Sequence, residues 1–73
     1  MALIDIKTEI TGNVWKIVAK VGDKVAEEDP ILILESMKME IPVLASEDGT
    51  VAEILTTEGE TVTEGAVVAR LRV

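Results

Sequence analysis

An internal repeat of 37 residues constrains the fold of this 73-residue chain more than any other feature of its sequence. A half this short cannot bury its own apolar face, so the two halves must close on each other. The repeat predicts a single domain, residues 1–73, with pseudo-two-fold symmetry and a core built from Val14, Ile17, Val25, Leu34 and their mates, unless the match reflects only the similar composition of the halves. The identical pairs are Ile4–Ile41, Gly12–Gly49, Val14–Val51, Ile17–Ile54, Gly22–Gly59, Val25–Val62, Glu27–Glu64 and Leu34–Leu71.

The composition favours strands over helices. Val, Ile and Thr together supply 25 of the 73 residues, and β-branched side chains suit a pleated sheet better than a helix. The best helical candidate, Glu53–Glu64, contains two adjacent threonines and Gly59, so we expect no helix there. Short apolar stretches separated by turn residues, with roughly four strands in each half, predict an all-β sandwich or barrel. These stretches are Ile4–Ile6, Val14–Val18, Ile31–Leu34, Ile41–Leu44, Val51–Leu55 and Val67–Val73.

Charge and residue usage exclude several classes of function. Seven basic residues against 14 acidic ones give a net charge of −7, which repels nucleic acids and anionic membrane surfaces, so we expect neither as a partner. The chain has no Cys and no His, and we therefore expect no metal site and no catalytic residue of its own. The N-terminus lacks the basic and apolar regions of a secretion signal, which favours a cytoplasmic protein.

The segment at the seam of the repeat, Ile33–Pro42, is expected to form a tight hairpin. A two-residue turn at Met37-Lys38 would pair Ser36 with Met39 and Glu35 with Glu40. Subtracting the repeat length from position 38 gives position 1, so the symmetry mate of this turn lies at the chain termini. The turn and the termini should therefore occupy opposite poles of the domain.

The residues of this turn conflict with its geometry. A type I′ turn needs positive φ at both central residues, which costs a residue with a side chain roughly 1–2 kcal/mol. Glu35 and Glu40 would also place like charges opposite each other. Such conflicts are expected at functional sites. These arguments leave two alternatives open: a looser loop, or a lysine attracted by its two flanking glutamates, with Met37 and Met39 as ordinary core residues.

Residues 35–40, Glu-Ser-Met-Lys-Met-Glu, resemble the attachment motif of biotinyl domains, the biotin carboxyl carrier proteins of biotin-dependent carboxylases. The flanking patterns around Gly22-Asp23 and Gly59-Glu60 are similar to the same family, and the chain is most like the single-domain biotin/lipoyl attachment proteins. The resemblance implies a flattened barrel, or sandwich, of two four-stranded antiparallel sheets. It also implies biotin as a covalent cofactor, linked by an amide bond to Lys38.

The resemblance further implies the partners of the domain. A biotin protein ligase would load Lys38, with Glu35, Met37 and Met39 as its recognition residues. Biotin carboxylase would then carboxylate the biotin, and a carboxyltransferase would receive the carboxyl group. Because a solvated lysine amine is almost entirely protonated at neutral pH, the ligase rather than this domain must activate it.

Two other functions remain open. A lipoyl carrier domain of an oxo-acid dehydrogenase complex would share the fold, but lipoyl domains typically have Asp before the lysine and often Ala after it, where this chain has Met37 and Met39. A non-modified interaction module is the other alternative. The chain also departs from the family at Glu28, where Gly is usual, which puts the shape of that turn in doubt.

Three further features of the sequence carry weaker signals. Ile31 and Ile33 could form an apolar docking patch on the outer face of their strand, or could be crowded beneath a neighbouring loop. The acidic segment Asp23–Asp29 lacks the spacing of a calcium loop and is expected to be a solvated turn. Trp15 is expected to serve in packing, and contact with a partner is the alternative.

Overall fold

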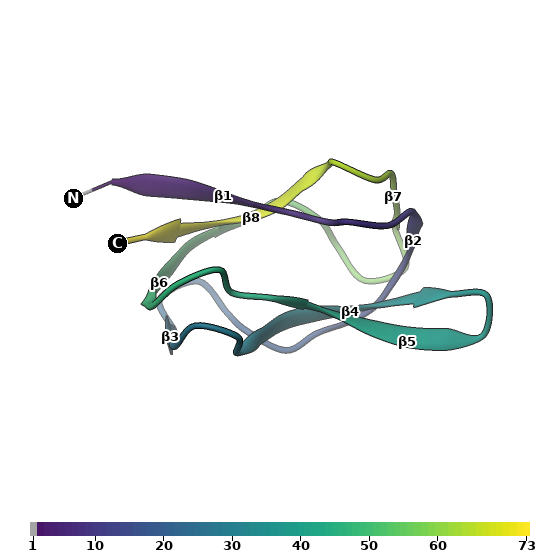
Figure 1. Cartoon of the computed structure of the whole chain (residues 1–73), viewed down its shortest axis with the longest axis horizontal. Coiled ribbons are helices and arrows are strands. Elements are labelled where there is room, and N and C mark those ends of the chain that lie inside the picture. The colour runs from purple at the N-terminus through teal and green to yellow at the C-terminus, as the bar shows by residue number, and fades with distance from the viewer. Residues whose placement is uncertain (1) are drawn as a thin grey trace.

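The computed structural model describes residues 2–73, which form eight β-strands and no helix (Figure 1). All six predicted strands are present, and each half contains an additional two-residue strand, β3 or β7. The strands are β1 (Leu3–Lys7), β2 (Gly12–Ile17), β3 (Lys24–Val25), β4 (Pro30–Ser36), β5 (Met39–Leu44), β6 (Gly49–Ile54), β7 (Thr61–Val62) and β8 (Val67–Arg72).

The strands form two four-stranded sheets with the orders β1-β8-β6-β3 and β5-β4-β2-β7. Every pair of neighbouring strands is antiparallel. Replacing each strand by its mate in the other half, β1 by β5 or β8 by β4, converts one order into the other. The predicted fold class and pseudo-two-fold symmetry are therefore confirmed.

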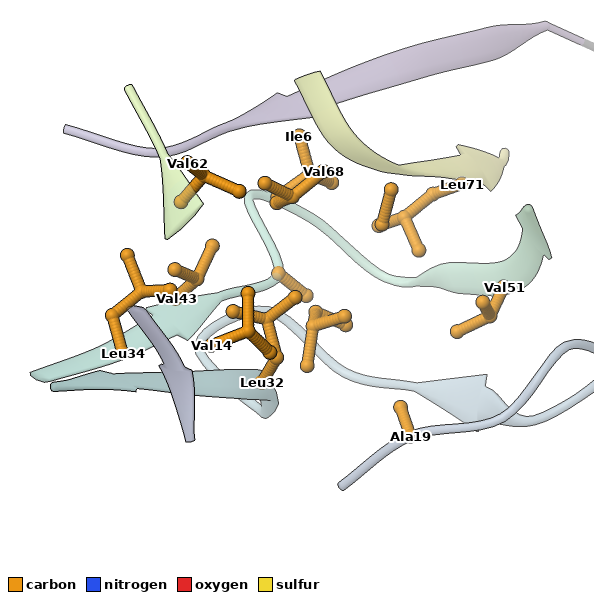
Figure 2. Close-up of a cluster of buried hydrophobic side chains, with 13 residues drawn as sticks. Ile6, Val14, Ala19, Leu32, Leu34, Val43, Val51, Val62, Val68 and Leu71 are labelled. Atoms are coloured by element: carbon orange, nitrogen blue, oxygen red, sulfur yellow. The ribbon is translucent and has the colours of Figure 1, made fainter. Parts of the chain in front are cut away.

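The core lies between the two sheets and draws on both halves (Figure 2). Among the predicted core residues, Val14, Leu34 and their mates are almost inaccessible to solvent, and Val62 is buried. Ile17, Val25 and Ile54 are partly buried and pack against this cluster. The other buried apolar residues are Ile6, Ala19, Ile31, Leu32, Val43, Ala45, Val68 and Ala69.

A β-bulge changes the expected position of Ile31. The register of β4 against β5 shifts between Pro30 and Leu32, and both Ile31 and Leu32 are fully buried. The Ile31 carbonyl also accepts hydrogen bonds from the backbone N–H groups of Val18 and Ala19. The hypothesis of an exposed patch that includes Ile31 is therefore wrong, and crowding beneath a neighbouring segment is correct; Ile33 alone faces outward and is half-buried.

Glu28 adopts the left-handed conformation that the family resemblance had put in question. Its φ is 74°, and its mate Gly65 has a φ of 87°. The Glu28 N–H donates to the Ala45 carbonyl, as the Gly65 N–H donates to the Thr8 carbonyl, and Ala45 and Thr8 are themselves mates. The two turns are thus equivalent, and Glu28 is held in a backbone conformation that suits glycine.

The hairpin and the termini lie at opposite ends of the domain, as predicted (Figure 1). The molecule measures 37 × 17 × 17 Å. The turn between β4 and β5 lies at one end of the view, and the N- and C-terminal ends lie together at the other. The long axis therefore separates the hairpin from the ends of the chain.

Candidate functional site

The β4–β5 hairpin has the predicted register and turn. Ser36 pairs with Met39 and Glu35 with Glu40. Met37 and Lys38 connect the strands with φ values of 52° and 67°, so both central residues are left-handed, as a type I′ turn requires. A looser loop at this position is excluded.

The turn presents Lys38 to solvent between two exposed methionines. Met37 is 92% exposed and Met39 is 59% exposed. The alternative in which both are ordinary core residues is therefore wrong. Lys38 is exposed as well, and within residues 2–73 its amine makes no hydrogen bond or ion pair. The hairpin thus holds a free primary amine at the tip of the domain, flanked by flexible, polarisable side chains that adapt to different surfaces.

Glu35 and Glu40 lie behind the turn on the outer face of the hairpin. They are directly opposite each other in adjacent strands, and both are exposed. Like charges in this arrangement weaken strand pairing. The pair therefore forms an acidic row that a partner with basic side chains would neutralise.

Close packing between β2 and β4 fixes the base of the hairpin. A Cβ atom at Gly12 would lie 2.9 Å from the Glu35 carbonyl oxygen, closer than side chains tolerate. On the next residue of β2, Asn13 pairs with Glu35 and accepts a hydrogen bond of 2.6 Å from the Thr61 hydroxyl. The sequence identified Gly12 as a repeat match, but the close approach of strands that requires it depends on the sheet order.

The polar clusters away from the hairpin have structural roles. The Asp23 and Asp29 carboxylates each accept a hydrogen bond from the backbone N–H three residues earlier, as in a solvated turn. Hydrogen bonds from the Thr56 hydroxyl and the Thr57 N–H lower the pKa of the Glu60 carboxyl. Across residues 2–73 no group of three or more Asp or Glu side chains is placed to hold a metal ion.

A shallow groove of about 370 Å³ lies between the end of β1 and strand β5, lined by residues 6–10 and 41–46. Lys38 does not line it. No helix in residues 2–73 could span a membrane.

Comparisons with known proteins identify relatives over nearly the whole chain. Residues 4–71 match the family model described as biotin-requiring enzyme. The biotin/lipoyl attachment protein of Bacillus subtilis is 42% identical over 66 residues, which cover 90% of each chain. The biotin carboxyl carrier protein of Streptococcus mutans is 44% identical over 54 residues, which cover 74% of this chain and 42% of that protein.

A solved structure matches equally well. The urea carboxylase of Kluyveromyces lactis superposes with a TM-score of 0.93 and 39% sequence identity. The superposition covers 99% of this chain and 6% of the carboxylase. The shared region is therefore one small unit of a much larger enzyme.

Proposed function

The chain belongs to the biotin/lipoyl family of biotin-requiring enzymes, and on that premise we propose that it is a biotin carboxyl carrier that is covalently biotinylated on Lys38. It is homologous to the carrier domains of biotin-dependent carboxylases. The observation that carries the proposal is the isolated, exposed Lys38 amine on a strained two-residue turn, at the pole opposite the termini.

The loading reaction joins the Lys38 amine to the carboxyl carbon of biotin. The neutral amine attacks the carbonyl of biotinyl-adenylate, the C–N bond forms, the C–O bond to the phosphate breaks, and AMP and a proton leave. Within residues 2–73 no carboxylate forms a hydrogen bond or ion pair with the Lys38 amine, and the sequence has no His, which supports a base supplied by the ligase. The domain contributes the position of the Lys38 amine, and Glu35, Met37 and Met39 are the recognition residues around it.

In the proposed cycle the domain is a non-catalytic carrier. A biotin carboxylase carboxylates the attached biotin, and a carboxyltransferase passes the carboxyl group to an acceptor. Both active sites must receive the arm on Lys38, which favours an attachment point on a protruding turn over one in a cleft. Because biotinyl-adenylate is made with ATP, we place the loading reaction in the cytoplasm.

A lipoyl carrier would need the same exposed lysine, and the family includes both kinds of attachment domain. Met37 and Met39 argue for biotin, since lipoyl domains typically carry Asp and often Ala at these positions. An unmodified interaction module would not explain the strained turn around an unpaired amine.

Intact-mass spectrometry distinguishes these functions. The chain is incubated with biotin, ATP and a purified bacterial biotin protein ligase, and in parallel with lipoate, ATP and a lipoate ligase. We expect the addition of one biotinyl group, mapped to Lys38 by peptide sequencing and lost in Lys38→Arg. Lys24→Arg, on β3, is the matched control and should remain fully loaded. Label on Lys7, Lys16, Lys20 or Lys24, or loading only with lipoate, would contradict the proposal.

A further inference from the structure

The internal symmetry allows the outer faces of the two sheets to be compared position by position. The outer face of the sheet β5-β4-β2-β7 is called the hairpin face, because this sheet contains the hairpin. Five of its outward positions are occupied by Trp15, Lys16, Ile33, Pro42 and Leu44. Their mates on the opposite face are Ala52, Glu53, Arg70, Asp5 and Lys7. Two surfaces with the same backbone thus carry different chemistry.

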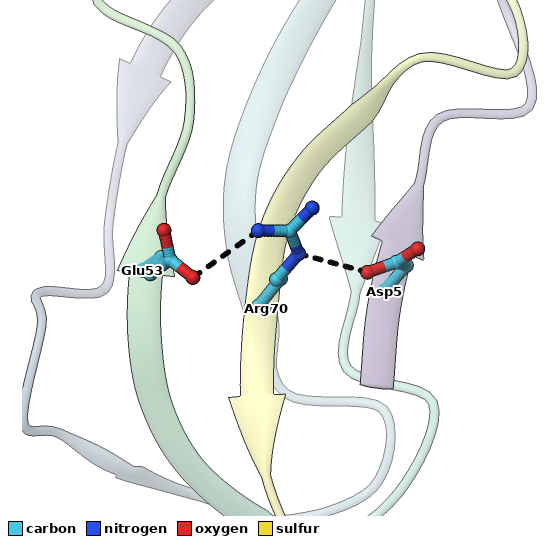
Figure 3. Close-up of polar contacts among 3 residues, drawn as sticks. All are labelled: Asp5, Glu53 and Arg70. Atoms are coloured by element: carbon cyan, nitrogen blue, oxygen red, sulfur yellow. Dashed lines mark hydrogen bonds and ion pairs between the residues drawn. The ribbon is translucent and has the colours of Figure 1, made fainter. Parts of the chain in front are cut away.

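The opposite face is occupied by charges that satisfy one another. Arg70 on β8 donates from Nε to Asp5 of β1 at 2.9 Å and from Nη1 to Glu53 of β6 at 3.3 Å (Figure 3). The hydrogen bond to Asp5, reinforced by Glu53, raises the pKa of Arg70 above its ordinary value. The three side chains of this row pair with one another across three strands. The row therefore offers a partner few unpaired polar groups and little apolar surface.

The equivalent row of the hairpin face is apolar except for Lys16 at its edge. Ile33 replaces Arg70, Pro42 replaces Asp5, and Lys16 at the edge of the row replaces Glu53. Trp15, which the sequence predicted to pack, lies at the β2 bulge and is 49% exposed, while Leu44 is 41% exposed. A half-exposed Trp beside Ile and Pro is the composition typical of the centre of a protein interface.

The apolar row is continuous with the candidate site. Along β4 and β5, Glu35 and Glu40 are the next outward residues after Ile33 and Pro42, and Lys38 follows at the turn. The inner face of the same strands is taken by the core. A two-residue turn is small beside the roughly 800 Å² that each partner of a stable complex buries, so a protein that binds Lys38 must extend onto the hairpin face.

A second copy of this chain is a poor occupant of the hairpin face. Face-to-face contact would bring two acidic rows together in a molecule of net charge −7. Strand addition at the β5 edge is opposed by Pro42, which has no N–H to donate. The face instead fits a protein surface with an apolar centre and basic side chains beside it.

We propose that the hairpin face is the docking surface for the biotin protein ligase, with Trp15 and Ile33 in apolar contact and Glu35 and Glu40 against basic side chains of the enzyme. The inference rests on the proposed function. The ligase is the occupant because it must recognise the domain before any biotin is attached, so affinity has to come from protein surface.

Steady-state loading kinetics test the inference, with a purified bacterial biotin protein ligase, saturating biotin and ATP, and the apo chain as the varied substrate. The test variant is Trp15→Ala with Ile33→Arg, which transplants the residues of the mate positions Ala52 and Arg70. The backbone already accommodates these side chains in the other half. We expect KM for the apo chain to rise about ten-fold or more with kcat within two-fold of the wild type, because the contacts bind the domain and do not touch the reacting atoms. Glu53→Gln, which changes the net charge by the same amount on the opposite face, should leave both constants unchanged.

Two further measurements complete the test. The single variant Trp15→Ala, at an exposed bulge, replaces the double variant if the latter does not fold, and should still raise KM. A Lys38→Arg chain, which cannot be loaded, should inhibit loading of the wild type, and the same chain with Trp15→Ala and Ile33→Arg should inhibit at least several-fold more weakly. An unchanged KM and equal inhibition, with Lys38 of the wild type fully loaded, would overturn the docking surface alone. A wild-type chain that gains no biotin would overturn the proposed function and the docking surface together.

Discussion

Three residues adopt a left-handed backbone conformation in which glycine or asparagine is normally found. Met37 and Lys38 form the turn of the hairpin, and Glu28 occupies the turn whose mate is Gly65. Left-handed residues with a Cβ cost roughly 1–2 kcal/mol each. At the hairpin this cost accompanies the candidate function; at Glu28 no function accounts for it. The two cases lead to separate predictions.

Replacing Met37 and Lys38 by Asn and Gly should stabilise the domain while abolishing biotinylation. Asn-Gly is the preferred pair for a type I′ turn, so we expect the free energy of unfolding to rise by about 1–2 kcal/mol. Urea denaturation and an avidin blot measure the two effects. Lys38→Arg is the control, because it loses the modification but keeps the strain. An intact fold with unchanged or lower stability would show that the turn is not strained.

Glu28→Gly should also stabilise the domain, by about 0.5–1 kcal/mol, because relief of the left-handed strain exceeds the extra entropy that glycine gives to the unfolded chain. The backbone hydrogen bond from residue 28 to the Ala45 carbonyl is retained. The reciprocal variant, Gly65→Ala, should destabilise. Thermal melts of both variants check the prediction, and shifts of the same sign would contradict it.

At the scale of strands, the close approach of β2 to β4 positions the hairpin. Gly12→Ala would force a Cβ against the Glu35 carbonyl, and Gly49→Ala would do the same against Arg72 at the far pole. We expect both variants to lose stability, but only Gly12→Ala to load biotin more slowly, by up to about 10²-fold if the amine moves by roughly 1 Å. Melting temperatures and initial loading rates measure the two effects. Equal loading rates for the folded variants would mean that β2 does not position Lys38.

The same scale shows what the sequence could predict. A two-residue turn determines the pairing of the residues on either side of it, so the register from Leu34 to Ile41 followed from the position of Met37-Lys38 alone. The positions of Trp15 and Ile31 did not follow, because both lie at bulges where the alternation of inward and outward residues breaks. A bulge is defined by how one strand pairs with its neighbour. The sequence of one strand alone does not specify that pairing. The contrast between the two outer faces likewise required the sheet order.

For the whole molecule, the fold should be independent of biotin, since the core lies between the sheets and Lys38 outside it. The unmodified chain should give a well-dispersed NMR amide spectrum. Leu34→Ala and its mate Leu71→Ala, both fully buried, should each lower the free energy of unfolding by about 2–5 kcal/mol. That is a large share of the stability of so small a domain. Molten spectra for the wild-type apo chain, or a negligible effect of either variant, would contradict this account of the core.

The two ends of the described chain are hydrogen-bonded neighbours. The Ala2 N–H donates to the Val73 carbonyl, and the Val73 N–H donates back to the Ala2 carbonyl. A domain whose two ends are adjacent can be inserted into a surface loop of another protein without stretching the domain or the loop. The domain could therefore be inserted into a larger enzyme without disturbing the fold of that enzyme. The turn would keep its distance from the point of insertion, because it lies at the far end of the 37 Å axis.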